Sequence, residues 1–158
     1  MTLPTRQERE KFNGHQALAI WLTGLPASGK STLALQVVQE LLNRNYIASV
    51  LDGYVLRLGL CRDLDYSPAS RSDNIRRAGE VVKLLVNTGL TVVVAFISPY
   101  LADLSRLRVL LGKDCFHEIF LNCPLDICKK RDPKGLYRKA RSGLITSFTG
   151  ITAPYRSS

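Results

Sequence analysis

The chain has 158 residues and a mass of 17.6 kDa, with 46% hydrophobic and 22% charged residues, which matches one globular domain that can bury its own core. No apolar run reaches the roughly 18 residues that a bilayer span needs, and the N-terminus has no apolar signal core, so we expect a cytoplasmic protein with no membrane partner. The net charge of +9 and the pI near 9.7 favour polyanionic partners without choosing among them.

Reduced thiols are predicted, because the cysteines show no paired C-x-x-C spacing and a chain of this size is held by its core. The four cysteines are Cys61, Cys115, Cys123 and Cys128. The two histidines, His15 and His117, are isolated in the sequence, and we assign them no ligand or catalytic role.

The first part of the chain reads as strand, helix, strand. A near-continuous apolar run at 17–23 is typical of a strand buried on both faces of a parallel sheet. Apolar residues then recur at helical spacing over 33–42, and this pattern ends near Asn43. A second apolar run at 47–51 predicts another strand.

The same alternation continues downstream. Ser67 and Pro68 supply an N-cap and a first-turn proline for a long amphipathic helix that ends before Gly89. A strand, a helix and another strand follow, at 90–97, 101–111 and 116–121. Alternating strands and helices predict an α/β fold with a doubly wound, mainly parallel sheet and flanking helices, as one domain over 1–158.

A phosphate-binding motif lies between the first strand and the first helix. The segment from Gly24 to Ser31 fits G-x-x-x-x-G-K-[ST]. Its backbone N–H groups would face the phosphates of ATP, with Lys30 on the β- and γ-phosphates and Ser31 on magnesium. The alternative is a glycine-rich turn with an incidental lysine. The predicted nucleotide-binding residues are Gly24, Leu25, Pro26, Ala27, Ser28, Gly29, Lys30, Ser31 and Thr32, with Arg131 further along the chain.

Ligands of open α/β sheets bind beyond the carboxyl ends of the strands. Three predicted strands end there in Asp52, Ser98 and Cys123. A basic segment with two glycines follows the last strand, which suits a lid over phosphates at about 132–150; the alternative is a solvated basic helix face. Its basic residues are Arg131, Lys134, Arg138, Lys139 and Arg141.

Several segments resemble, in order, signatures of the adenylyl-sulfate (APS) kinase family, over roughly Arg6 to Tyr155. These are the residues leading into the P-loop at 20–25, then 62–68 with Arg71, Asn74, Ile75, Arg76 and Arg77, and finally 95–100, 131–137 and 148–151. The resemblance implies a P-loop kinase, usually a dimer, that transfers the γ-phosphate of ATP to the 3′-hydroxyl of adenylyl sulfate to give PAPS.

By motif position, the resemblance also implies a pocket for adenylyl sulfate. Tyr66 and Phe148 would sandwich the adenine, and guanidinium groups suit the sulfate and phosphate oxygens. The pocket residues are Arg57, Tyr66, Arg71, Asn74, Ile97 and Phe148, with Lys134 and Leu136 beside them. Lys30, Asp52 and Ser98 are the candidate catalytic residues. For Ser98 the family role is a phosphoserine intermediate, and a turn serine that caps the next helix is the alternative.

The chain departs from the family pattern twice. Relatives usually have Asp-Gly-Asp-Asn after the second strand, whereas this chain has Tyr54 at the second aspartate, so a candidate base or magnesium anchor is replaced by a phenol. The chain also ends at Ser158, where relatives continue into another strand and helix, so we expect an exposed or partner-paired edge at the fourth strand.

Three alternatives to an APS kinase stay open on the sequence. One is an impaired nucleotide-binding homologue, and another is a P-loop kinase for a different small acceptor. A nucleic-acid binder ranks last, because it rests on charge alone without a binding signature.

Overall fold

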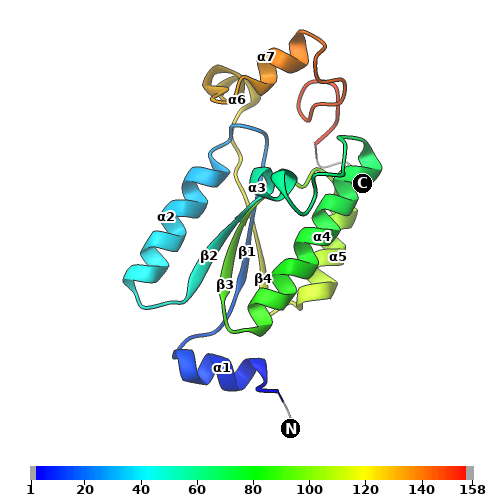
Figure 1. Cartoon of the computed structure of the whole chain (residues 1–158). Helices are drawn as coiled ribbons and strands as arrows, with labels where there is room; N and C mark the ends of the chain where they lie inside the picture. Colours follow the sequence, from blue (N-terminus) through cyan, green and yellow to red (C-terminus); the bar gives the residue numbers. More distant parts are fainter. Residues whose placement is uncertain (1–2, 156–158) are drawn as a thin grey trace.

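The computed structural model describes residues 3–155, and Met1, Thr2 and the chain end from 156 to Ser158 lie outside the described residues. Four parallel strands form one sheet in the order β2-β3-β1-β4, so the predicted, mainly parallel sheet is confirmed (Figure 1). The strands are β1 (Ala19–Thr23), β2 (Ala48–Asp52), β3 (Thr91–Ala95) and β4 (Phe116–Phe120). Each lies inside or within one residue of its predicted run.

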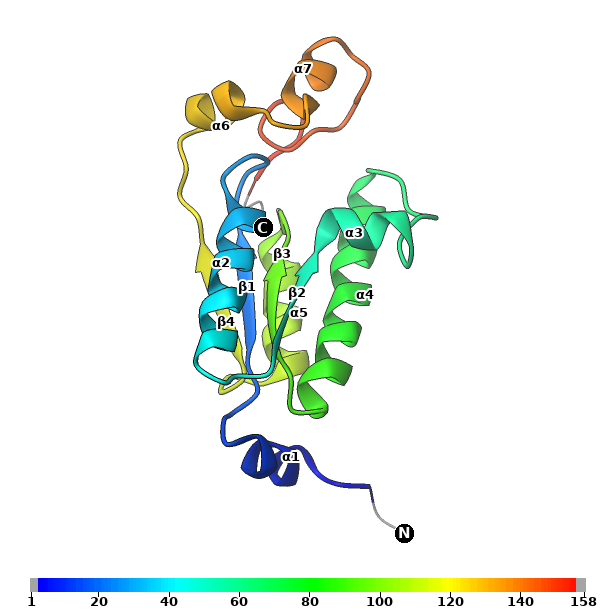
Figure 2. The same ribbon diagram turned by 60° about the vertical axis from the view of Figure 1, so that its left-hand side comes forward.

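Helices cover both faces of this sheet (Figure 2). They are α2 (Lys30–Asn43) on one face, and α4 (Pro68–Asn87) and α5 (Leu101–Leu111) on the other. The period-2 alternation of strand side chains produces this doubly wound arrangement. Trp21 and Val94 pack toward α4 and α5, while Leu22 and Val93 pack toward α2, and all four side chains are fully buried.

The predicted start of α4 is confirmed. The Ser67 hydroxyl accepts a hydrogen bond from the backbone N–H of Ser70 at 3.3 Å, and Pro68 occupies the first helical turn. The helix ends at Asn87, just before Gly89, whose φ of 88° fits a glycine better than any other residue.

One helix at the amino end of the sheet was not predicted. Helix α1 (Arg6–Asn13) buries no residue, so its sequence carries no apolar period. A capping box between Thr5 and Glu8 starts it, and Arg6 fastens it to the domain by donating a hydrogen bond to the Ala17 carbonyl at 2.7 Å.

Three short helices at the carboxyl edge of the sheet were not predicted either. They are α3 (Gly53–Leu58), α6 (Leu125–Arg131) and α7 (Leu136–Arg141). Helices α6 and α7 lie beyond the carboxyl ends of the strands, whereas α1 lies beyond their amino ends (Figure 1). Each has at most seven residues, which is too short to show a helical period.

Strand β4 lies at one edge of the sheet, with β1 beside it and Ile119 46% exposed. Among residues 3–155, no helix is both long enough and apolar enough to cross a membrane.

Candidate functional site

The turn between β1 and α2 has the backbone shape that the motif predicts. Gly24 has a φ of 154°, and a Cβ there would lie only 2.9 Å from the Leu121 carbonyl oxygen. Gly29 caps α2 in the left-handed region with a φ of 102°. Both positions therefore require glycine, and the turn leads directly into the N-terminus of α2, where backbone N–H groups are free to bind an anion.

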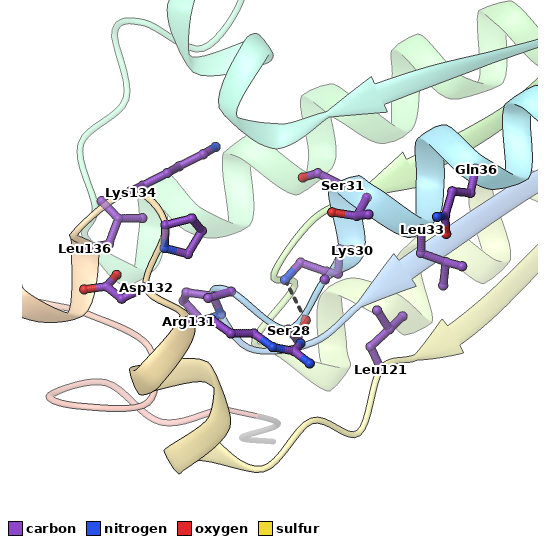
Figure 3. A pocket seen from close by; sticks show the side chains of 15 residues that line it. Ser28, Lys30, Ser31, Leu33, Gln36, Leu121, Arg131, Asp132, Lys134 and Leu136 are labelled. Carbon is purple, nitrogen blue, oxygen red and sulfur yellow. Dashed lines mark hydrogen bonds between the residues drawn. The ribbon is translucent and has the colours of Figure 1, made fainter.

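A cavity of about 700 Å³ opens beside this turn, and we call it the P-loop cavity. It has the size of a typical small-molecule site. Figure 3 shows Arg131 beside Ser28 of the turn, with Lys134 extending away from it. The predicted nucleotide-binding residues that line the cavity are Pro26, Ala27, Ser28, Gly29, Lys30, Ser31, Thr32 and Arg131.

Lys30 is folded back onto its own turn. Its ammonium donates to the carbonyl oxygens of Gly24 and Leu25, at 2.9 and 2.7 Å, and to the Ser28 hydroxyl at 3.3 Å (Figure 3). The side chain is only 8% exposed, and this burial lowers the pKa of Lys30 to about 8. The two carbonyl oxygens hold the Lys30 ammonium at the wall of the P-loop cavity, where phosphate oxygens can replace them as hydrogen-bond acceptors.

The depressed pKa of Lys30 predicts that nucleotide affinity depends on pH. Phosphate oxygens favour the charged lysine, so binding above the pKa of about 8 must take up a proton. We expect the Kd of a non-hydrolysable ATP analogue to be level from pH 7 to 8 and then to rise about tenfold per pH unit. Calorimetry in buffers of different ionisation enthalpy would measure the proton uptake, and a Kd that is flat to pH 9.5 would contradict the prediction.

The side-chain oxygens of Ser31 and Asp52 lie next to each other at the end of β2. The Ser31 hydroxyl donates to Asp52 Oδ2 at 2.5 Å, and Asp52 Oδ1 accepts from the backbone N–H of Tyr54 at 2.8 Å. The second bond caps α3 and fixes the carboxylate in place. A hydroxyl next to a carboxylate is the hard oxygen donor set that a magnesium ion prefers, so these residues fit the predicted metal site.

A second, narrower cavity of about 190 Å³ adjoins the first. The two cavities share wall residues, among them Lys30, Ser31 and Leu136. The second cavity is lined by Asp52 and by six of the residues that sequence reasoning proposed for adenylyl sulfate. These are Arg57, Tyr66, Arg71, Asn74, Ile97 and Leu136.

Asn74 stands out among these residues. It is 7% exposed, and its Oδ1 has no hydrogen-bond partner within the described part of the chain. A buried polar atom without a partner costs free energy unless a ligand or water satisfies it. The unpaired oxygen therefore marks this wall of the second cavity as a place for a hydrogen-bond donor.

The two arginines of the second cavity already have protein partners. Arg57 lies 4.4 Å over the Tyr66 ring. Arg71 donates to the Thr149 hydroxyl at 2.5 Å and to the carbonyl oxygens of Ser147 and Tyr66. Arg71 therefore holds the 147–149 segment against α4, a structural task that its sequence position did not reveal.

The structure places Phe148 elsewhere than expected. Phe148 packs edge-on against Tyr137 at 5.0 Å between ring centroids, in a small core of the lid, and it is not among the residues that line the second cavity. The aromatic pair of Tyr66 and Phe148 is therefore not formed in this conformation. Apolar burial inside the lid outweighs exposure of the ring at the cavity.

The basic segment separates into two groups. Arg131 and Lys134 line the P-loop cavity, whereas Arg138, Lys139 and Arg141 are exposed on α7. The ammonium of Lys134 lies 4.1 Å over the ring of Tyr54. The basic segment and α3 therefore meet between the two cavities, and the role of this segment as a lid stays a prediction.

Ser98 lines the second cavity, but its hydroxyl has a structural partner. The side chain is 1% exposed, and its oxygen accepts a hydrogen bond from Trp21 Nε1 at 2.8 Å. Its φ of 47° is unusual for a residue with a side chain. The phosphoserine role stays a prediction from the resemblance.

Ser98→Ala is expected to keep kcat within about threefold, because in-line phosphoryl transfer needs no protein nucleophile. It should cost about 1 to 3 kcal/mol of unfolding free energy, since the buried Trp21 N–H loses its partner. Denaturant unfolding and turnover should be compared with Ser105→Ala, which removes a hydroxyl from the exposed surface of α5. A folded Ser98→Ala protein that has lost turnover would support the phosphoserine instead.

Sequence reasoning missed several residues of the site. Tyr137 donates its hydroxyl hydrogen bond to the Pro26 carbonyl at 2.9 Å and so docks the lid on the P-loop. Gln36 lines the P-loop cavity from α2, and the helical spacing from Thr32 was the signal that could have found it. Asp132 caps the turn into α7 by accepting from the N–H groups of Tyr137 and Arg138.

The parallel sheet, the glycine turn at the N-terminus of α2, and the hydrogen bond from Ser31 of α2 to Asp52 at the end of β2 define a P-loop kinase. Residues 16–158 match the family described as adenylylsulphate kinase. The chain belongs to the adenylyl-sulfate kinase family.

Individual relatives agree with this assignment. The adenylyl-sulfate kinase of Yersinia pestis is 52% identical over 97% of this chain and 72% of its own length. That of Geotalea daltonii is 53% identical over 96% of this chain and 74% of its own length. The Mycobacterium tuberculosis APS kinase CysC, solved in complex with AMPPNP and APS, is 44% identical with a TM-score of 0.86, covering 90% of this chain and 84% of that one.

Proposed function

We propose that this chain transfers the γ-phosphate of ATP to the 3′-hydroxyl of adenylyl sulfate, giving PAPS. The observation that carries the proposal is the junction of the two cavities at Lys30 and Ser31. A phosphoryl donor in the P-loop cavity and an acceptor in the second cavity would meet at that shared wall. In-line transfer requires such an arrangement, with the attacking and leaving oxygens on opposite sides of the phosphorus.

The chain's contribution to the donor side is positioning and charge. The glycine turn offers backbone N–H groups, the N-terminus of α2 adds its partial positive charge, and Lys30 and Arg131 supply full charges at the cavity wall. Lys30 would exchange its carbonyl ligands for phosphate oxygens. Because the ammonium is already held at the cavity wall, the protein would need little reorganisation when phosphate oxygens replace the carbonyl groups. A preorganised cation of this kind stabilises the charge that develops in the transition state.

Ser31 and Asp52 would hold magnesium through their oxygens, since they already lie 2.5 Å apart. When bound, magnesium neutralises charge on the phosphate oxygens. The cap that Asp52 forms on the Tyr54 N–H keeps its carboxylate at the carboxyl end of β2. The carboxylate is thereby oriented toward Ser31 before any ligand enters.

On the acceptor side, Arg57, Tyr66, Arg71 and Asn74 would bind adenylyl sulfate, with Ile97 and Leu136 as apolar walls. The second cavity, at about 190 Å³, is smaller than typical ligand sites of about 300 Å³ or more. Entry of adenylyl sulfate would therefore require the contact between Lys134 and Tyr54 to open. Phe148 would join the pocket through rearrangement of the lid core.

The direct test is transfer of label from γ-labelled ATP to adenylyl sulfate by the purified chain, with PAPS identified as the product. Adenosine, AMP and other small alcohols serve as competing acceptors in the same assay. Tight binding of both nucleotides without turnover would favour the impaired homologue, and faster labelling of another alcohol would favour a different kinase. A homodimer in the cytoplasm is also part of the proposal, and analytical ultracentrifugation tests the dimer.

Asn74→Ala is expected to weaken binding of adenylyl sulfate about five- to thirtyfold, which corresponds to loss of one hydrogen bond of about 1 to 2 kcal/mol. Affinity for an ATP analogue should stay within about twofold, because Asn74 lines only the second cavity of the two. Calorimetry with each ligand separately measures both values. Asn87→Ala, at the exposed far end of the same helix, is the matched control, and equal losses for both ligands would contradict the pocket.

Arg71→Ala is a less selective test of the same pocket. The variant removes the donor that binds the 147–149 segment, so stability and lid position change together with the pocket. Asn74 is therefore the cleaner position for assigning the second cavity to adenylyl sulfate.

A further inference from the structure

Two cysteines lie together where β4 leads into α6. Cys123 follows the strand and is partly exposed, while Cys128 lies within α6 and is fully buried. The thiol of Cys128 donates to the carbonyl oxygen of Cys123 at 3.8 Å, and Cys123 packs against the small core that contains Cys128. The two cysteines are therefore neighbours in the fold, although their sequence spacing is not a C-x-x-C motif.

This pair is connected to the nucleotide site from two sides. Arg131 donates from Nη1 to the sulfur of Cys123 at 3.8 Å, and the same guanidinium lines the P-loop cavity beside Ser28 (Figure 3). Cys128 packs with Tyr137, whose hydroxyl binds the Pro26 carbonyl of the P-loop. If the positions of Cys123 and Cys128 changed, Arg131 and Tyr137 would move with them, and both contact the nucleotide-binding turn or its cavity.

The other two thiols have a different environment. Cys61 and Cys115 are 0% and 2% exposed, in the core beneath α4 and α5. Cys123 is thus the thiol that solvent reaches, and it is next to a guanidinium, the kind of cationic neighbour that favours attack by sulfur. Burial raises the pKa of Cys128 to about 11, so Cys128 is suited to a second step and not to the first.

We propose that Cys123 and Cys128 form a site of oxidative modification by hydroperoxides, and that the disulfide form binds nucleotide weakly. In the first step the Cys123 sulfur attacks the hydroperoxide, the O–O bond breaks, and water or an alcohol leaves as Cys123 becomes a sulfenic acid. In the second step the Cys128 sulfur displaces the hydroxyl group, which leaves as water with the Cys128 proton. Two thiols lose two electrons, and one hydroperoxide gains them.

The disulfide acts on the nucleotide site through Arg131 and Tyr137. A disulfide holds its two sulfur atoms about 2 Å apart, closer than two unbonded sulfurs can approach, so α6 must shift toward the residues that follow β4. Arg131 also loses the thiol sulfur that now orients its guanidinium. This loss of affinity rests on the proposed nucleotide-binding function, whereas the reactivity of the thiols does not.

The reactivity is tested on the full chain by limited alkylation with iodoacetamide and by hydrogen peroxide treatment, each followed by peptide mass mapping. We expect Cys123 to be alkylated at least about tenfold faster than Cys61 and Cys115, which serve as internal references. Peroxide should yield the disulfide between Cys123 and Cys128 in the wild type. Cys128→Ser should stop at a sulfenic acid that dimedone traps, and Cys123→Ser should form neither product.

The effect on the site is measured as the Kd of a fluorescent ATP analogue before peroxide, after peroxide and after dithiothreitol. We expect a rise of about tenfold or more that dithiothreitol reverses, with no rise in Cys123→Ser. Absence of the disulfide in folded protein, or its presence with an unchanged Kd, would overturn the proposal. If the reduced protein fails to bind the analogue, the proposed function is wrong, and the peptide map still decides the modification.

Discussion

Lys30→Ala is expected to lower kcat about 10³-fold while leaving the fold intact, because a preorganised cation aimed at the transferred phosphoryl group is removed. The side chain is buried with a depressed pKa, so the folded protein gains little from its charge. The acceptors that lose its ammonium are the carbonyl groups of Gly24 and Leu25 and the hydroxyl of Ser28. Ser28 and Lys30 itself line the P-loop cavity, where water can take the place of the ammonium.

Turnover, circular dichroism and thermal unfolding of Lys30→Ala should be compared with Lys139→Ala, which removes the same charge from the exposed face of α7. The control should keep turnover within about twofold, since a solvated charge on an exposed face contributes little. A purified and folded Lys30→Ala protein with undiminished turnover would end the P-loop assignment.

Tyr54→Asp is expected to raise kcat about 10²-fold or more, within the range of about 10² to 10⁴ that a general base contributes. Tyr54 lines the second cavity together with Lys30, Ser31 and Asp52, so the substituted carboxylate would lie at the transfer centre. Carboxylates accept protons at neutral pH, whereas phenols as a class stay protonated. The wild type should be slow but active, because Lys30 and the P-loop still position and neutralise the phosphates.

Two further substitutions separate basicity from bulk at this position. Tyr54→Asn has nearly the shape of the aspartate without its charge, so it should not reproduce the gain in kcat. Tyr54→Gly should improve binding of adenylyl sulfate without improving the rate, if the ring, 56% exposed under Lys134, narrows the second cavity. If no substitution changes rate or binding, Tyr54 does not lie at the transfer centre.

Much of the fold was predictable because its signals are local. Strands β1 and β3 are short, mainly apolar runs, and α4 carries its own cap at Ser67 and its own proline. The P-loop was predictable for the same reason, since its glycines, lysine and serine lie within one short segment. The helices α1, α3, α6 and α7 escaped prediction, because they are short or bury no apolar face.

The sequence by itself determined where the strands lie along the chain, the phosphate-binding turn and the family. All three depend on short stretches of contiguous residues. Only the tertiary structure decided which separated residues meet. In the folded chain the Ser31 hydroxyl donates to Asp52, and the Lys134 ammonium lies over the Tyr54 ring. The Ser98 hydroxyl accepts a hydrogen bond from the Trp21 indole N–H. These contacts depend on how strands and lid pack over long sequence distances, where burial and hydrogen-bond satisfaction select the partners and no local pattern records the choice.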